Sequence, residues 1–205
     1  MVNSQLRARG VFDERVLAAI DRVPRHEFAP ERYRHQAYED HPLPIGENQT
    51  ISQPYIVALM LQALELAPTD RVLEIGTGSG YVTALLAELT AQVISIERHS
   101  SLAESAQALL RALGYSNVNV LIGDGTRGFP EGAPYDAIIV SAAAPNIPPA
   151  LLEQLAAGGR LIIPVGTEEG QQLLKVRMEN GEPRTEFREL CRFVPLVSEE
   201  APPNT

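Results

Sequence analysis

Three glycines at alternate positions follow a short apolar run, residues 72–75, in this chain of 205 residues. They are Gly76, Gly78 and Gly80, and a helix-period apolar pattern begins directly after them. A strand, a glycine turn and a helix are how an α/β domain presents bare backbone N–H groups to a ligand. Each glycine removes a side chain where the backbone must turn tightly or approach a ligand closely. The motif alone is weak, because a glycine-rich turn can also be simple geometry.

Two acidic residues end the next two apolar runs. Glu97 lies 21 residues after Gly76, where a carboxylate can accept hydrogen bonds from both hydroxyls of a ribose. Asp124 lies beside Gly125, where a carboxylate can accept a hydrogen bond from an adenine amino group. Taken singly, each acid fits a solvated strand end or a turn equally well. Because open α/β sheets bind ligands at the carboxyl ends of their strands, the three features together favour an adenosine site.

The glycine spacing discriminates between adenosine cofactors. Dinucleotide enzymes use G-x-G-x-x-G, in which the glycine turn leads a pyrophosphate to a helix N-terminus. Here the third glycine comes one residue early, and Tyr81 takes the position where that pattern has Gly or Ala. We therefore expect S-adenosylmethionine, which carries adenosine and an amino acid but no phosphate. NAD remains the alternative on these residues alone.

The elements that must position these residues alternate between strand and helix from Asp70 onward. Continuous apolar runs separated by helical patterns predict a parallel sheet covered on both faces. After residue 166 the period changes, and Asn180-Gly181 between two alternating runs predicts an antiparallel hairpin. We therefore expect an α/β fold with a doubly wound, Rossmann-like and mostly parallel sheet. The predicted strands are residues 72–75, 93–96, 118–122, 137–140 and 161–165, and the helices among them are residues 102–113 and 151–155.

Local signals place the helix ends and the segment before the sheet. Ser101 and Glu104 form a capping-box pair in front of the helix at 102–113, and Gly114 follows it. Asp13 is a plausible N-cap for a helix at 13–23. Residues 38–53 carry prolines and polar side chains without a period, which predicts an irregular segment with a functional role. Pro54 then opens a helix whose predicted inner face is Ile56, Leu59, Met60 and Ala63.

Length and composition bound the class of protein. We expect one domain over 1–205, with N-terminal helices and a substrate segment at 1–69, a cofactor core at 70–166 and a hairpin and tail at 167–205. The net charge of −9 argues against nucleic-acid partners. No run approaches the ~20 apolar residues that span a membrane, and the polar N-terminus resembles no secretory signal. With Cys191 as the single cysteine, we expect a cytoplasmic protein, and a monomer as the default.

The four histidines, His26, His35, His41 and His99, show no metal-ligand spacing, so we expect no metal.

A family resemblance covers most of residues 23–166. The stretches that carry it are VPRHEFAP, AYEDHPLPIGENQTISQPYIVALM, VLEIGTGSGY, SIER, GDGTRGFPEGAPYDAIIVSAAAPNIP and LLEQLAAGGRLIIPVG. G-x-G-x-G with an acid after the second strand resembles class I S-adenosylmethionine-dependent methyltransferases in general. The whole set, in this order, is similar to the protein-L-isoaspartate O-methyltransferase family. Within it, TISQP at residues 50–54 is specific to that family and is not shared by methyltransferases in general.

The resemblance implies an activity and a set of site residues. Such enzymes transfer a methyl group from S-adenosylmethionine to the α-carboxyl exposed at L-isoaspartyl residues of damaged proteins and peptides. The resulting ester closes to a succinimide and returns some normal aspartate, with S-adenosyl-L-homocysteine as the other product. Ser52 matches the family's active-site serine. The predicted cofactor residues are Gly76, Thr77, Gly78, Gly80, Glu97, Arg98, Asp124 and Gly125, and the predicted substrate residues are Thr50, Ser52, Pro164, Val165 and Gly166.

The chemistry fits these residues. A backbone-type α-carboxyl has a reference pKa of roughly 3.3–3.7, so it is ionised at neutral pH and needs no general base. Ser52 is then a hydrogen-bond donor that aims one carboxylate oxygen, although helix capping ahead of Pro54 is an alternative. We expect the peptide to pair with backbone at 50–52 and 164–166. The rival functions are a methyltransferase for a small molecule or for nucleic acid, a nicotinamide oxidoreductase and a non-catalytic nucleotide-binding module.

Overall fold

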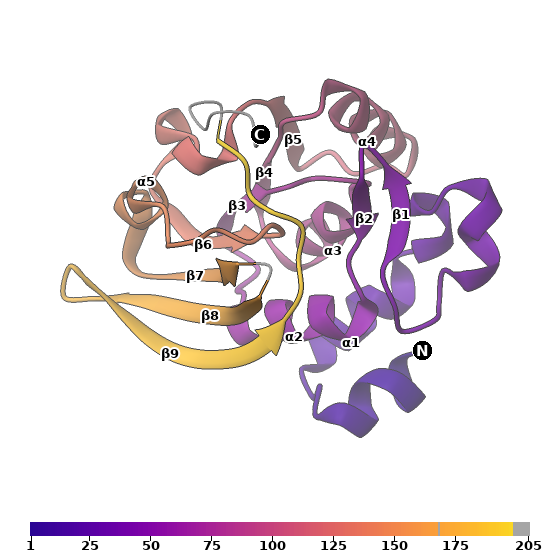
Figure 1. The fold of residues 1–205 in the computed structure, drawn as a ribbon, viewed down its shortest axis with the longest axis horizontal. Helices are drawn as coiled ribbons and strands as arrows, with labels where there is room; N and C mark the ends of the chain where they lie inside the picture. Colours follow the sequence, from indigo (N-terminus) through magenta and orange to yellow (C-terminus); the bar gives the residue numbers. More distant parts are fainter. Residues whose placement is uncertain (168, 199–205) are drawn as a thin grey trace.

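A seven-stranded sheet forms the centre of the protein, with the order β5-β4-β3-β6-β7-β8-β9 (Figure 1). The computed structural model describes residues 1–167 and 169–198. From β3 the chain builds outward through β4 and β5, then returns to the other side of β3 for β6 and β7, all in parallel. The predicted doubly wound α/β sheet is therefore confirmed. The strands of this sheet are β3 (Arg71–Ile75), β4 (Gln92–Glu97), β5 (Val118–Ile122), β6 (Tyr135–Val140), β7 (Leu155–Thr167), β8 (Gly170–Glu179) and β9 (Glu182–Cys191).

Helices and loops bury both faces of this sheet. In β6, Ala137 and Ile139 join one apolar cluster, whereas Ile138 and Val140 join the other, as the two-residue period of a strand requires. The first cluster includes residues of α1 (Glu14–Arg22), α2 (Pro54–Leu64), α3 (Tyr81–Leu89) and α4 (Ser100–Ala112). The second includes α5 (Pro149–Glu153). A sheet buried on both sides explains why its strands read as continuous apolar runs.

The helix ends follow local rules in some places and not in others. Asp13 caps α1 as predicted, with its side chain accepting from the N–H groups of Arg15 and Val16. The capping box predicted for α4 is wrong, because α4 begins at Ser100 and its N-cap, His99, makes no side-chain hydrogen bond. Ser101 Oγ instead donates to Glu47 Oε1 at 2.9 Å. Gly114, with φ +88°, follows the helix as predicted.

Two further expectations about helices are corrected. The helix predicted at 151–155 ends at Glu153, and Leu155 already begins β7, where it is buried in the second cluster. On α2, Met60 is buried as expected, but Ile56, Leu59 and Ala63 are only half-buried. The other residues that α2 buries are Pro54, Val57, Ala58, Leu61 and Leu64. Apolar residues occupy most of the circumference of α2, so the period could not select its inner face.

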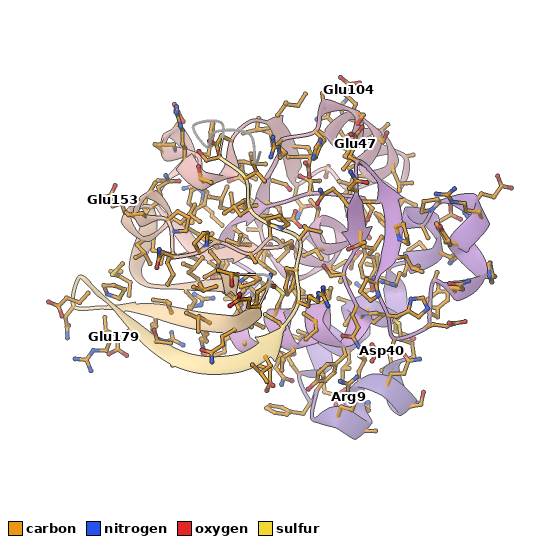
Figure 2. The ribbon with its side chains drawn as sticks, viewed as in Figure 1. Arg9, Asp40, Glu47, Glu104, Glu153 and Glu179 are labelled. Atoms are coloured by element: carbon orange, nitrogen blue, oxygen red, sulfur yellow. The ribbon has the colours of Figure 1, made fainter. Side chains whose placement is uncertain are left out.

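Residues 38–53 contain a hairpin, contrary to the prediction of an irregular segment. Strands β1 (Leu43–Gly46) and β2 (Gln49–Ile51) pair antiparallel and are joined by Glu47 and Asn48, at φ +50° and +56°. Strands of three and four residues are too short to produce a readable period. Figure 2 shows Glu47 at the end of this hairpin, on the side of α4.

Asp40 fixes the start of α2 from outside the helix. Its Oδ1 accepts from the N–H of Tyr55 at 3.0 Å, which satisfies a backbone donor that the N-cap, Gln53, leaves unpaired. Its Oδ2 accepts from Gln53 Nε2 at 2.9 Å and from Arg9 Nη1 at 2.5 Å. Arg9 and Asp40 are labelled in Figure 2. The turn that carries Ser52 into α2 is therefore held by a residue twelve positions upstream of it.

The C-terminal part adds a hairpin and then a strap. Asn180 and Gly181, at φ +53° and +83°, join β8 to β9 in the predicted two-residue turn. Beyond β9, the side chain of Gln171 accepts from Phe193 N at 2.6 Å and donates to Phe193 O at 3.1 Å. Residues 194–197, which we call the C-terminal strap, then cross the carboxyl edge of the sheet (Figure 1). Ala143 anchors the strap, because its N–H donates to Val194 O and its carbonyl accepts from Leu196 N, both at 2.7 Å.

An ion pair with little solvent exposure joins Asp70, the residue before β3, to Arg160 of β7, and it gives a stability prediction. Arg160 Nη2 lies 2.5 Å from Asp70 Oδ2, and both side chains are nearly inaccessible. Asp70→Asn should lower the free energy of unfolding by about 3 kcal/mol, because it leaves a buried guanidinium without its counter-charge. Urea denaturation measures this. Glu14→Gln, which breaks the exposed pair with Arg7, is the matched control and should leave the midpoint unchanged. Equal losses in both variants would contradict the prediction.

Candidate active site

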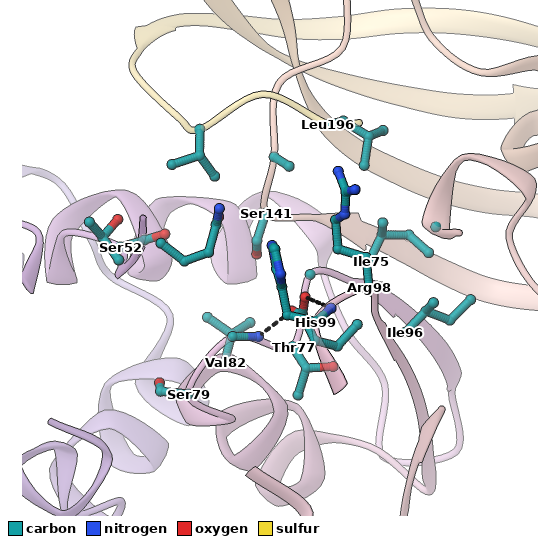
Figure 3. Close-up of a pocket in the computed structure, with 18 of the residues that line it drawn as sticks. Ser52, Ile75, Thr77, Ser79, Val82, Ile96, Arg98, His99, Ser141 and Leu196 are labelled. Carbon is teal, nitrogen blue, oxygen red and sulfur yellow. Dashed lines mark hydrogen bonds between the residues drawn. The ribbon is translucent and has the colours of Figure 1, made fainter. Parts of the chain in front are cut away.

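The carboxyl ends of β3, β4 and β6 open into the main cavity (Figure 3). β3 has β4 on one side and β6 on the other, so the cavity lies where the order of strands reverses. Open α/β sheets bind their ligands at this point. The β1–β2 hairpin and the C-terminal strap supply further walls. The lining residues are 49–52, 75–79, 81–82, 96–99, 125, 141–142 and 194–197.

The glycine turn adopts backbone conformations that favour glycine at each of its three positions. Gly76, Gly78 and Gly80 have φ of +92°, +54° and +87°. Gly76 and Gly78 line the main cavity, whereas Gly80 does not. A Cβ on Gly80 would lie 3.2 Å from Ala106 and 3.3 Å from Leu110, so this glycine allows α3 to approach α4. Cofactor contact by Gly80 stays a prediction.

Glu97 joins the end of β4 to the glycine turn. Its Oε2 accepts from Gly78 N and its Oε1 from His99 N, both at 2.9 Å. The side chain is buried but lines the main cavity, as does Arg98. Each carboxylate oxygen has a further lone pair, so Glu97 can hold the turn and accept from ribose hydroxyls at once. The sequence therefore placed this acid in the cavity correctly, while its ligand contact stays a prediction.

A hydroxyl network beneath the turn ends on a buried acid. Thr77 Oγ1 lies 2.5 Å from Ser95 Oγ, and Ser95 donates to Glu74 Oε2 at 2.6 Å. Thr83 donates to the same oxygen at 2.5 Å, while Oε1 of Glu74 has no partner among the described residues. Burial raises the pKa of Glu74 to about 7. The floor of the cavity thus rests on a carboxyl group that ionises near neutral pH.

Asp124 is not among the described residues that line the main cavity. Its Oδ1 accepts from Thr126 N at 2.9 Å and Thr126 Oγ1 at 2.7 Å, and its Oδ2 accepts from Ser198 at 3.2 Å. The neighbouring Gly125 does line the cavity, and a Cβ there would lie 2.3 Å from Ile75 Cγ2. Asp124 therefore shapes the loop that brings Gly125 against β3. Its contact with an adenine amino group stays a prediction.

A second pocket of ≈ 460 Å³ adjoins the main cavity. The two share Thr50, Ser52, Ser141 and Val194 as lining residues. Ser52 lies at this junction, and its hydroxyl makes no hydrogen bond with any residue in the described part of the chain. The helix-capping alternative for Ser52 is wrong, since Asp40 supplies that cap. The rest of the second pocket is lined by residues 42, 53, 56 and 190–193.

Pro164, Val165 and Gly166 lie outside both pockets. They belong to β7, where β8 pairs with them on one side. On the other side Ala144 N donates to Pro164 O at 3.1 Å, and Gly166 N donates to Ala144 O at 2.9 Å. Their backbone groups are thus engaged within the chain. Their contact with substrate stays a prediction.

Several lining residues were missed by the sequence analysis. Ser141 directly follows β6 at the carboxyl edge, so the rule that pointed to Glu97 and Asp124 would have pointed to it as well. Ser79 and His99 adjoin predicted residues. The strap gives no such signal, because its position depends on contacts with Ala143 and Gln171 that are distant in sequence.

The described residues contain neither a metal-binding cluster nor a membrane-spanning helix. Within residues 1–167 and 169–198, no group of three or more His, Cys, Asp or Glu side chains is placed to hold a metal ion. None of the helices in this described part has the length and apolar character needed to cross a membrane.

Comparisons with known proteins agree on one family. The profile of the family described as Protein-L-isoaspartate(D-aspartate) O-methyltransferase matches residues 1–201. The protein-L-isoaspartate O-methyltransferase of Koribacter versatilis is 54% identical over 200 residues, covering 98% of this chain and 90% of that protein. The enzyme of the same name from a Roseiflexus species is 58% identical over 195 residues, covering 94% and 88%.

Solved structures give the same result. A protein-L-isoaspartate O-methyltransferase superposes with a TM-score of 0.82 at 30% identity, covering 94% of this chain and 63% of the other. A putative enzyme of this family from Plasmodium falciparum superposes with a TM-score of 0.81 at 28% identity, covering 93% and 94%. That structure is a complex with S-adenosyl-L-homocysteine.

The buried Glu74 should make stability depend on pH. Its pKa is about 7 in the folded protein but ~4.3 in an unfolded chain, so between these values the folded protein binds more protons. The free energy of unfolding of the wild type, relative to Glu74→Gln, should therefore fall by up to about 3 kcal/mol as pH rises through this window. Urea titrations of both proteins from about pH 5 to about pH 8 measure it.

Ser95→Ala removes one donor to the Glu74 carboxylate, so it should extend the window to higher pH. A difference between wild type and Glu74→Gln that stays constant with pH would show that Glu74 does not titrate there.

Proposed function

The chain belongs to the protein-L-isoaspartate O-methyltransferase family, and we propose that Ser52 is its active-site hydrogen-bond donor. It is a protein-repair enzyme that transfers a methyl group from S-adenosylmethionine to the free α-carboxyl of L-isoaspartyl residues. Its substrates are damaged proteins and peptides that contain such residues. The methyl ester leads to a succinimide and to partial return of normal aspartate.

The main cavity suits an adenosine cofactor without phosphates. A buried carboxylate, Glu97, faces it, and Arg98 is the only Arg or Lys among the described lining residues. S-adenosylmethionine, when bound, supplies an electrophilic methyl group on a positively charged sulfur. We assign the holding of the cofactor to Gly76, Thr77, Gly78, Glu97, Arg98 and Gly125. We also propose cofactor contact by Gly80 and Asp124, which in addition set the glycine turn and the loop that carries Gly125.

Ser52 carries the proposed mechanism because of its location. It lines both the main cavity and the second pocket, and its hydroxyl is not used by the described residues. A substrate carboxylate is ionised at neutral pH, so the hydroxyl needs to donate a hydrogen bond rather than remove a proton. A hydrogen bond to one oxygen aims the carboxylate. Orientation of this kind can supply up to ~7–11 kcal/mol in favourable intramolecular reactions.

The second pocket is the proposed place for the peptide chain. Only β1 pairs with β2 in the described chain, so the other edge of β2 offers backbone groups next to Thr50 and Ser52. An extended peptide can add to such an edge. We propose that Pro164, Val165 and Gly166 contact the backbone of the bound peptide, and that their hydrogen bonds with Ala144 fix the loop after β6.

The remaining proposals concern the protein as a whole. We propose one domain over 1–205, with the divisions 1–69, 70–166 and 167–205, acting as a cytoplasmic monomer on proteins rather than on nucleic acid or at a membrane. The net charge of −9 supports the exclusion of nucleic acid. The exposed large apolar side chains of the described residues are scattered over different elements, which supports a monomer.

Labelled methyl transfer to an isoaspartyl peptide and to its aspartyl twin tests the proposal. We expect transfer to the isoaspartyl peptide alone. Ser52→Ala should fold normally and lose about 100-fold or more in kcat/KM, because the carboxylate is no longer aimed. Ser105→Ala, which removes an exposed serine hydroxyl on α4, is the matched control and should keep wild-type kcat/KM. Full activity of Ser52→Ala would refute the role of Ser52.

Glu97→Gln tests the cofactor site. The amide of glutamine has a single acceptor oxygen, so it cannot accept hydrogen bonds from both Gly78 N and His99 N. The glycine turn then loses one of these hydrogen bonds, and a bound ribose loses one acceptor. The Kd for S-adenosyl-L-homocysteine, measured by calorimetry, should rise about tenfold or more. Glu104→Gln on the exposed side of α4 should not change this Kd. An unchanged Kd in Glu97→Gln would remove Glu97 from the site.

A further inference from the structure

Arg25 is a completely buried arginine that touches the chain at Ser52. It lies in the short helix η3 (Arg25–Phe28) and is 0% exposed. Its Nη2 donates to the carbonyl oxygen of Ser52 at 2.8 Å, and its Nε donates to the carbonyl of Ala37 at 2.8 Å. It therefore joins the backbone of the proposed active-site residue to a segment 15 positions upstream.

This burial is energetically unfavourable. Arg25 forms no ion pair with the described residues, although the charge of Asp40 acts on it from a greater distance, and its Nη1 has no hydrogen-bond partner there. Removing an unpaired guanidinium from water is strongly disfavoured, and burial accordingly lowers the pKa of Arg25. An apolar side chain of similar volume would avoid this penalty. Packing alone does not account for an arginine here.

Arg25 also touches the cofactor side of the site. Its Cζ lies 4.6 Å from the ring centroid of Tyr81, within range of a cation–π contact. Tyr81 is the first residue of α3, directly after the glycine turn, and it lines the main cavity. Phe28 supports the same ring edge-on, at a centroid distance of 5.6 Å. One planar side chain thus lies between Ser52 and the residue that follows the glycine turn.

We propose that Arg25 is a positioning residue that sets the location of Ser52 relative to the glycine turn. The proposal rests on the proposed function of Ser52. A guanidinium presents donors in a fixed fork and a flat face to an aromatic ring, whereas a lysine ammonium presents neither. Arg25 makes its two carbonyl contacts through different nitrogens while its face lies against Tyr81. Lysine should therefore keep the charge but not the alignment.

Arg25→Lys tests this role. Its kcat/KM for an isoaspartyl peptide should fall about 10- to 100-fold, because small displacements of aligning groups have effects of this order. The Kd for S-adenosyl-L-homocysteine should change less than about threefold, since Gly78 and Glu97 are untouched. Arg160→Lys is the matched control, because Arg160 is an arginine with only 12% of its side chain exposed that also donates to two carbonyls, those of Leu64 and Glu65. It should lower Tm and leave kcat/KM unchanged.

A double variant separates positioning from general support of the fold. In the Ser52→Ala background no hydroxyl remains to be aimed, so Arg25→Lys should have little further effect on kcat/KM. Fully additive losses would overturn the proposal. An active Ser52→Ala variant would overturn the proposed function itself. An inactive Ser52→Ala beside a fully active Arg25→Lys would overturn only the role of Arg25.

Arg25→Met is the second variant. The methionine side chain occupies the space of the buried arginine without its charge or its hydrogen-bond donors. This variant should also lose activity while staying folded, with all assays made well below the measured Tm. If neither Arg25 variant folds, Arg25 is a folding determinant and the positioning role is overturned.

Discussion

The carboxylate of Glu97 holds together the two strands on which the site depends. Its hydrogen bonds to Gly78 and His99 connect the turn after β3 with the residues after β4. The glycine turn also sets the start of α3, where Tyr81 lies against Arg25. A displacement of this carboxylate would therefore affect the cofactor cavity and the support of Ser52 together. Its burial makes such a displacement costly, because a buried carboxyl group that loses its hydrogen-bond donors is left unsatisfied.

Much of the core could be predicted because its signals are local. The central strands were located by apolar runs, Glu97 by its place at a strand end, and Gly125 by the family resemblance. The predictions failed where a residue's partner is far away in sequence. Ser101 matches a capping box but bonds to Glu47 on the hairpin. Leu155 continues a helical period but is drawn into β7 by its pairing with Tyr135 of β6.

The contacts around Ser52 also depend on residues that are far away in sequence and could not be predicted. Its motif was readable in the sequence, but the reason that it is held in place was not. Asp40 caps α2 from one direction, and Arg25 holds the Ser52 carbonyl from another. Neither contact has a periodic or motif signal, since each joins loops that meet only in the folded chain. The second pocket is likewise formed by residues more than 130 positions apart, from Thr50 and Ser52 to Leu190 and Val194.

Val194 lines both the main cavity and the second pocket. The strap that carries it is fixed by Ala143 and, through Phe193, by Gln171. A substitution at this position should therefore affect both sites, since Val194 lines both the proposed cofactor cavity and the proposed peptide pocket. Evolution of a different peptide preference by change at Val194 would carry an altered cofactor affinity with it. Residues confined to the second pocket, such as Ile56 and Leu190, are the ones free to diversify independently.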